Sequence, residues 1–198
     1  MNEYEIDNEN ELLELAHSLG EPVSSRRNGP LIDKLIPLNP FDAHPQSLSA
    51  NFGTTDFPYH TDGVYFPIPP KYIILRYIQG VENPTPTTIR DLNEIKQADK
   101  ELLQYSIWKV QAIRTFYSSI LAQDSSYYRF DRCIMKPLNK ANDNSERFSD
   151  IVLGLPVQTI NWKINKTVVI DNWKCLHNRP GVKAEEINFR TLQRIMIL

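Results

Sequence analysis

The sequence predicts an α+β chain built mainly on β-strands and folded as a β-sandwich or barrel. Short segments in which apolar and polar residues alternate recur through the second half of the chain, and this is the period of half-buried strands. Helical spacing is confined to one segment near the N-terminus and another in the middle. Fourteen prolines against seven glycines in 198 residues indicate many stiff connections between short elements. Many short strands with few helices are typical of sandwiches and barrels.

The first expected element is a helix close to the N-terminus. Its apolar face is formed by Leu12, Leu15, Ala16 and Leu19. Asn8 or Asn10 can cap its start, and Gly20 is expected to end it in the left-handed conformation. A polar turn over residues 24–30 and an edge strand over residues 31–38 should follow.

The middle of the chain is expected to alternate between strands and short helices. Residues 47–52 fit a strand that leads directly into segment 57–63, and residues 72–78 fit a buried strand. Residues 88–91 have the form of a helix capping box, and Asp99 can cap a second short helix.

The rest of the chain is predicted to be strands joined by loops. The polar segment 139–149 is expected to be a mobile loop. The expected strands cover residues 107–117, 127–135, 157–164, 167–171 and 189–198.

Composition excludes several classes of protein. A net charge of −2 and a pI near 6.1 provide no basic surface for nucleic acid, and no apolar run is long enough to span a bilayer. Cys133 and Cys175 are too few for a disulfide framework. The acidic N-terminus lacks the apolar core of a signal peptide. We therefore expect one domain, residues 1–198, in the cytoplasm, without nucleic-acid or membrane partners.

A histidine and a carboxylate two residues apart mark a candidate metal site. In an extended segment, His60 and Asp62 point to the same side because side chains alternate along a strand. The candidates for a third ligand are His17, His44 and His177. His177 follows a β-like run and a polar turn. Two histidines and one carboxylate with open positions suit non-haem Fe(II), and the same ligand types also serve zinc in hydrolases.

The last predicted strand carries two arginines on one face. Alternation places Arg190, Leu192, Arg194 and Met196 on the same side. Guanidinium groups bind carboxylates in a bidentate manner, and a buried arginine needs such a partner. An inward face would therefore hold an anionic ligand near the metal, whereas the alternative is the solvent face of an edge strand.

Three segments together resemble one known family. They are residues 57–63 (FPYHTDG), 171–179 (DNWKCLHNR) and 190–194 (RTLQR). Their order and spacing are similar to those of the taurine dioxygenase/clavaminate synthase-like family of Fe(II)- and 2-oxoglutarate-dependent oxygenases. The similarity extends from about residue 12 to residue 198. It implies a double-stranded β-helix, or jelly roll, with flanking helices.

The resemblance also implies the metal and its ligands. His60, Asp62 and His177 would be the catalytic residues that hold Fe(II). The co-substrates would be 2-oxoglutarate and O2, and the products succinate, CO2 and an oxidised substrate. Related halogenases have a small residue at the carboxylate position, so Asp62 favours hydroxylation or desaturation.

Three further residues would bind the co-substrate. Arg190 matches the arginine that pairs with the distal carboxylate of 2-oxoglutarate, and Thr87 matches the threonine that assists it. Arg194 matches a position that in relatives lies near the co-substrate or an anionic substrate group.

The substrate and the partners are expected in general terms only. The stretch between Asp62 and His177 is too short for a large lid over the site. We therefore expect a small or a carrier-tethered substrate, and a partner subunit or a homo-oligomer could complete the pocket. Two other functions stay open: a jelly-roll hydrolase or isomerase that uses zinc or manganese, and a binding module without catalysis.

Overall fold

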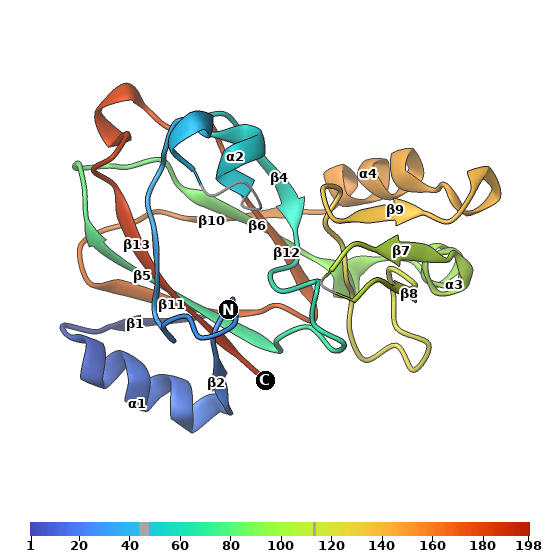
Figure 1. Ribbon diagram of the computed structural model, residues 1–198, viewed down its shortest axis with the longest axis horizontal. Helices are drawn as coiled ribbons and strands as arrows, with labels where there is room; N and C mark the ends of the chain where they lie inside the picture. Colours follow the sequence, from blue (N-terminus) through green and yellow to red (C-terminus); the bar gives the residue numbers. More distant parts are fainter. Residues whose placement is uncertain (44–47, 113) are drawn as a thin grey trace.

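The computed structural model describes residues 1–43, 48–112 and 114–198 (Figure 1). Its centre is a pair of facing antiparallel sheets, as expected for a jelly roll. The major sheet has the order β1 (Asn2–Glu5), β11 (Lys166–Asp171), β5 (Tyr72–Gln79), β13 (Thr191–Ile197) and β2 (Pro22–Val23), and β3 (Asp33–Leu35) also pairs with β13. The minor sheet has the order β10 (Val157–Ile160), β6 (Thr87–Asp91), β12 (Cys175–Arg179) and β4 (Phe57–His60). The predicted fold class is therefore confirmed.

The two sheets enclose an apolar interior. The major sheet contributes Leu75, Val168 and Met196, and the minor sheet contributes Ile89 and Ile160. Because side chains alternate along each strand, the residues between these point to the outer face of their sheet. Apolar residues on the outer faces must be shielded from water by other elements.

Helices and a small third sheet provide that cover (Figure 1). Helix α1 (Glu9–Leu19) packs Leu12 and Ala16 against Ile195 on the outside of the major sheet. The outside of the minor sheet packs against α3 (Gln97–Tyr105), α4 (Ser145–Gly154) and the sheet of β8 (Phe116–Ser118), β7 (Trp108–Val110) and β9 (Met135–Pro137). Four described 3-10 helices span Pro40–Asp42, Leu92–Glu94, Lys140–Asn142 and Ala184–Glu186. Among the described residues, no helix is long and apolar enough to cross a bilayer.

The N-terminal helix is confirmed, with one correction at its end. The Asn8 side chain accepts a hydrogen bond from the Glu11 backbone and caps the first turn. Gly20 ends the helix, but its φ of 160° is extended rather than left-handed. The missing side chain matters for a different reason: a Cβ at Gly20 would lie 2.3 Å from the Leu198 carbonyl oxygen.

The capping box predicted at residues 88–91 is wrong, because these residues form the strand β6. It pairs with β10 on one side and β12 on the other, which places it inside the sheet. Thr87 and Ile89 point inward, and Arg90 points outward to Tyr59. Asp91 does cap a helical turn, but only the 3-10 turn that starts after it.

The mobile loop predicted at residues 139–149 is also wrong. These residues contain a 3-10 turn and the start of α4. Phe148 and Val152 on that helix are buried in the cluster around Trp108, so apolar packing decides the structure despite the polar composition.

Other strand boundaries differ from the prediction. Residues 47–52 were expected to be a strand, but helix α2 spans Leu48–Phe52, and residue 47 lies outside the described residues. The single strand predicted at residues 107–117 is replaced by β7 (Trp108–Val110) and β8 (Phe116–Ser118), and residue 113 lies outside the described residues. Residues 127–134 are irregular, with one bridge at Tyr128. The strand predicted at residues 157–164 is β10, which ends at Ile160, and the strand predicted at residues 189–198 is β13, which starts at Thr191. Helix α3 starts at Gln97, two residues before the predicted cap Asp99.

Candidate metal centre

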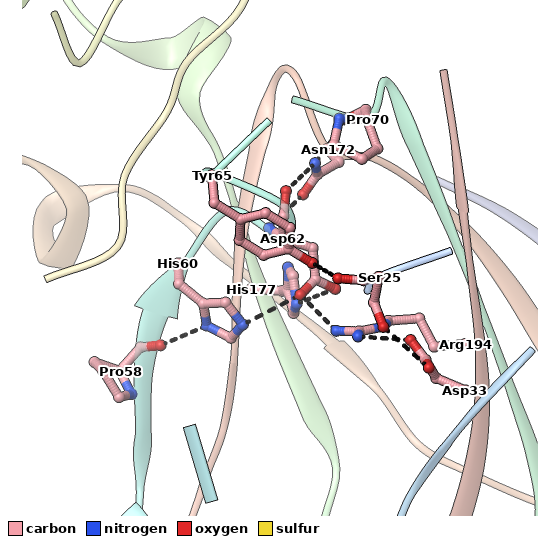
Figure 2. A network of polar contacts seen from close by, with 10 residues as sticks. All are labelled: Ser25, Asp33, Pro58, His60, Asp62, Tyr65, Pro70, Asn172, His177 and Arg194. Carbon is pink, nitrogen blue, oxygen red and sulfur yellow. Dashed lines mark hydrogen bonds and ion pairs between the residues drawn. The ribbon is translucent and has the colours of Figure 1, made fainter. Parts of the chain in front are cut away.

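Two histidines face each other across neighbouring strands of the minor sheet. His60 ends β4, and His177 lies directly opposite it in β12. Their ring centroids are 4.4 Å apart, and both side chains point into the barrel (Figure 2). Of the other candidates for a third ligand, His17 is exposed on α1 and His44 lies outside the described residues.

Asp62 completes the cluster from the turn that follows β4. Its Oδ1 lies 3.9 Å from His60 Nε2, and its Oδ2 lies 3.6 Å from His177 Nε2. The three ligand atoms all lie within 4.8 Å of one another, and each residue is 6% exposed. His60 and Asp62 were expected to share one extended segment, but the strand ends at His60. Asp62 reaches the site because the chain turns there, with Gly63 at a φ of +67°.

Asn172 fixes the backbone of Asp62. Its Oδ1 accepts the Asp62 N–H at 2.9 Å, and its Nδ2 donates to the Asp62 carbonyl at 3.0 Å and to the Pro70 carbonyl at 2.7 Å (Figure 2). Asn172 is completely buried. Asn172 precedes β12, so it ties the turn before His177 to the backbone of Asp62.

The protonation states of the cluster suit a metal. The His60 Nδ1 lies 2.9 Å from the Pro58 carbonyl, which can only accept, so Nδ1 donates a hydrogen bond and Nε2 is the ring nitrogen that can face a metal. Burial, reinforced by the neighbouring His60, lowers the pKa of His177 to about 3. Burial opposes ionisation of Asp62, but Arg194 and the two histidines outweigh it and lower its pKa. Neutral imidazoles and a carboxylate are the forms that bind metal ions.

Arg194 lies beside the cluster and contacts two carboxylates. Its Nη1 donates to Asp62 Oδ1 at 2.7 Å, and its Nη2 donates to Asp33 Oδ2 at 2.9 Å (Figure 2). Tyr65 is near the same group, and burial raises its pKa to about 12. Its hydroxyl donates to the Ser25 carbonyl at 2.6 Å.

Arg190 lies just before β13 and is 2% exposed. Its Nη2 donates to the Thr85 carbonyl at 3.2 Å, and its Nε has no hydrogen-bond partner among the described residues. Burial lowers its pKa, against the opposing effect of Glu186. The ladder between β13 and β5 shifts register after Thr191, so Arg190 and Arg194 do not belong to one regular alternation.

Thr87 is buried and points into the space between the two sheets, toward Trp162. Its hydroxyl accepts a hydrogen bond from Trp162 Nε1 at 3.2 Å. The Trp162 ring lies 6.4 Å from the ring of Tyr77. Tyr77, like Glu186, opposes the lowering of the Arg190 pKa by burial. Contacts among the predicted residues join His60, Asp62, His177 and Arg194, whereas the side chains of Arg190 and Thr87 hydrogen-bond with Thr85 and Trp162.

Asp33 was not predicted to belong to the site. The sequence contains only a weak signal for Asp33. It lies on the same side of the predicted edge strand as Leu35, and an aspartate on the buried side of a strand needs a cation nearby. Arg129 is also buried, and it donates to the carbonyls of Val64, Phe66 and Pro67.

Comparisons with known proteins identify the fold. No protein-family model matches the sequence, and no curated protein matches it. Among solved structures, it is similar to the non-haem iron oxygenase OrfP in complex with Fe, succinate and (3S)-hydroxy-L-Arg, with a TM-score of 0.72 and 17% identity over 96% of this chain. It is also similar to an asparagine oxygenase in complex with Fe(II), 2S,3S-3-hydroxyasparagine and succinate, with a TM-score of 0.70 and 16% identity over 94% of this chain.

These similarities define a class of fold. OrfP in complex with Fe and alpha-ketoglutaric acid matches with a TM-score of 0.71 and 18% identity. The chain spans 66% of the first of these oxygenase chains and 63% of the other two. The protein therefore has the jelly-roll fold of non-haem iron oxygenases. Two histidines and one carboxylate are a set of ligands that can bind a metal ion and leave three of its positions open.

Proposed function

We propose that this protein is an Fe(II)- and 2-oxoglutarate-dependent oxygenase. The observation that carries the proposal is the buried cluster of His60, Asp62 and His177, whose ligand atoms lie within 4.8 Å of one another in a fold shared with non-haem iron oxygenases. When bound, Fe(II) would supply the activation of O2. The reaction would convert a substrate C–H bond, O2 and 2-oxoglutarate into a hydroxylated product, succinate and CO2.

The chain's own residues would bind and orient the reactants. His60 and His177 would hold the metal through Nε2, and Asp62 would hold it through a carboxylate oxygen. Arg190 is buried, and its Nε has no partner in the part of the chain that the structure describes, so it would pair with the distal carboxylate of 2-oxoglutarate. Thr87 would support that carboxylate, and the apolar barrel interior would exclude water from it.

The substrate would be a small molecule or a group tethered to a carrier. The matched structures contain hydroxylated arginine or hydroxylated asparagine, so a free or carried amino-acid-like substrate is a reasonable first screen. Because the chain covers about two thirds of those oxygenases, a partner chain or a second copy can complete the substrate pocket. The location of the protein in the cytoplasm stays a prediction.

Anaerobic spectroscopy tests the proposal directly. Adding Fe(II) and then 2-oxoglutarate to the metal-free protein should produce the weak visible charge-transfer band of the chelate. His60→Ala and Asp62→Ala should abolish both the band and iron-dependent succinate formation. His17→Ala removes an exposed histidine on α1 and serves as the matched control. A protein that binds metal without the band would support the zinc or manganese hydrolase instead.

A further inference from the structure

Arg194 connects a metal ligand to a carboxylate outside the cluster. Nη1 donates to Asp62 at 2.7 Å, and Nη2 donates to Asp33 at 2.9 Å. The two aspartate side chains are 8% and 9% exposed, and Arg194 itself is 17% exposed. A guanidinium with two such partners forms charge-assisted hydrogen bonds in a fixed plane, so its orientation is set from both sides.

Asp33 is itself well fixed. It lies in β3 directly opposite Arg194 in the ladder with β13, so the backbone sets the spacing of the pair. Its Oδ1 accepts a hydrogen bond from the Ser25 hydroxyl at 3.1 Å. Arg26 is 3.9 Å from the same oxygen, but the Arg26 side chain is 64% exposed and contributes little.

This arrangement leaves one oxygen of Asp62 for the metal. Arg194 engages Oδ1, whereas Oδ2 is the oxygen that lies 3.6 Å from His177 Nε2. Asn172 already fixes the Asp62 backbone, so the remaining freedom is rotation of the carboxylate. The hydrogen bond from Arg194 restricts that rotation.

We infer that Asp33 is a positioning residue of the metal centre, which acts through Arg194 to make Asp62 a ligand with a single free oxygen. The inference rests on the metal site of the proposed function. It also means that both terminal nitrogens of Arg194 already have carboxylate partners within the chain.

Calorimetric titration of the full, metal-free chain with Co(II) tests this inference without turnover. Asp33→Ala should weaken Co(II) binding by about tenfold, the lower end of the range for residues that orient metal ligands. Asp33→Asn keeps an acceptor for Arg194 and should recover part of the loss. The visible Co(II) spectrum should change in Asp33→Ala because Arg194, held by one carboxylate only, no longer fixes the orientation of the Asp62 carboxylate. Asp99→Asn, which removes a carboxylate from the Arg147 pair far from the site, is the matched control and should bind Co(II) as the wild type does.

A double-mutant cycle separates positioning from the long-range field of the Asp33 charge. If Asp33 acts through Arg194, Asp33→Ala should change Co(II) affinity by less than about twofold in an Arg194→Gln background. An unchanged affinity in Asp33→Ala, or the same loss in both backgrounds, would overturn the inference.

Two further measurements keep the inference testable. If Asp33→Ala does not unfold cooperatively, Arg194→Lys probes the same bridge, because one ammonium cannot fork to both carboxylates. Unchanged Co(II) binding in Arg194→Lys would also overturn it. Failure of the proposed function has a different signature: the wild type would not bind Co(II), or would bind it equally well as His177→Ala.

Discussion

Asn172 holds Asp62 through both backbone groups of the aspartate, although the two residues are 110 positions apart in the chain. One side chain thus satisfies a buried donor and a buried acceptor, and it also binds the Pro70 carbonyl. The position of Asp62 is therefore set by the β11–β12 turn as well as by the turn after β4.

Asn172→Ala should destabilise the protein strongly. The change leaves the Asp62 N–H and two carbonyls buried without these partners, and each such group costs about 1–3 kcal/mol. We expect the free energy of unfolding of the metal-free protein to fall by at least about 3 kcal/mol in urea denaturation, which is the lowest cost of leaving three groups unpaired. Asn93→Ala changes an exposed asparagine and should stay within about 0.5 kcal/mol of wild type. A comparable loss in both variants would contradict a specific role for Asn172.

Gly63→Ala should disturb the turn that carries Asp62. Gly63 has a φ of +67°, and an added Cβ would lie 2.5 Å from Pro70 Cδ. Left-handed strain and this contact together should cost at least about 1–3 kcal/mol, measured as a lower melting temperature. Gly154→Ala is the control, because nothing lies within 4 Å of its Cβ at the end of α4, and there alanine should stabilise by about 0.5–1 kcal/mol. Equal melting temperatures for wild type and Gly63→Ala would show that the turn can relax.

The stability of the metal-free protein should depend on pH through His177. The unfolded imidazole takes up a proton near pH 6.5, whereas the folded one has a pKa of about 3. Between these values the unfolded state binds more protons, so the free energy of unfolding should decrease as the pH falls. The contribution of this residue approaches about 1.4 kcal/mol per pH unit. Urea denaturation from pH 7.5 to 4.5 measures the slope, and His177→Gln should reduce it. An unchanged slope in that variant would assign the effect to other groups.

Arg190→Gln should weaken binding of 2-oxoglutarate. Loss of a charge-assisted pair of about 1.5–3 kcal/mol corresponds to a dissociation constant about 10- to 100-fold higher. Titration of the Fe(II) protein under anaerobic conditions, followed at the charge-transfer band, measures this constant. Arg132→Gln removes an exposed arginine and should leave it unchanged. Equal affinities for wild type and Arg190→Gln would remove Arg190 from the co-substrate site.

The fold class and the grouping of His60, Asp62 and His177 could be predicted from the sequence because both depend on simple patterns. Strands β5, β11 and β13 are mostly apolar runs that are buried at most positions, which is a strong strand signal, and His60, Asp62 and His177 are residue types that commonly bind metal ions. The structure brings His60 and His177 together through one strand pairing, which alternation alone does not specify.

The errors share a physical cause. In β6, Thr88 and Asp91 satisfy a local capping pattern, but pairing on both edges of the strand outweighs it. In α4, polar residues obscure the helical spacing of Phe148 and Val152, whose packing partners lie far away in the sequence. Asp33 was missed because its partner Arg194 lies 161 residues away. Long-range contacts decide each case, and a local pattern does not contain them.

The pairing of β4 with β12 also links metal binding to the order of folding. His60 and His177 become neighbours only after the chain between them has closed the minor sheet, and Asn172 must reach Asp62 across 110 positions. Closure of such long loops is slow compared with the formation of α1. Unfolded and partly folded chains should therefore lack the site. The appearance of Co(II) absorbance during refolding would time the closure of the barrel, at the step when the minor sheet becomes complete.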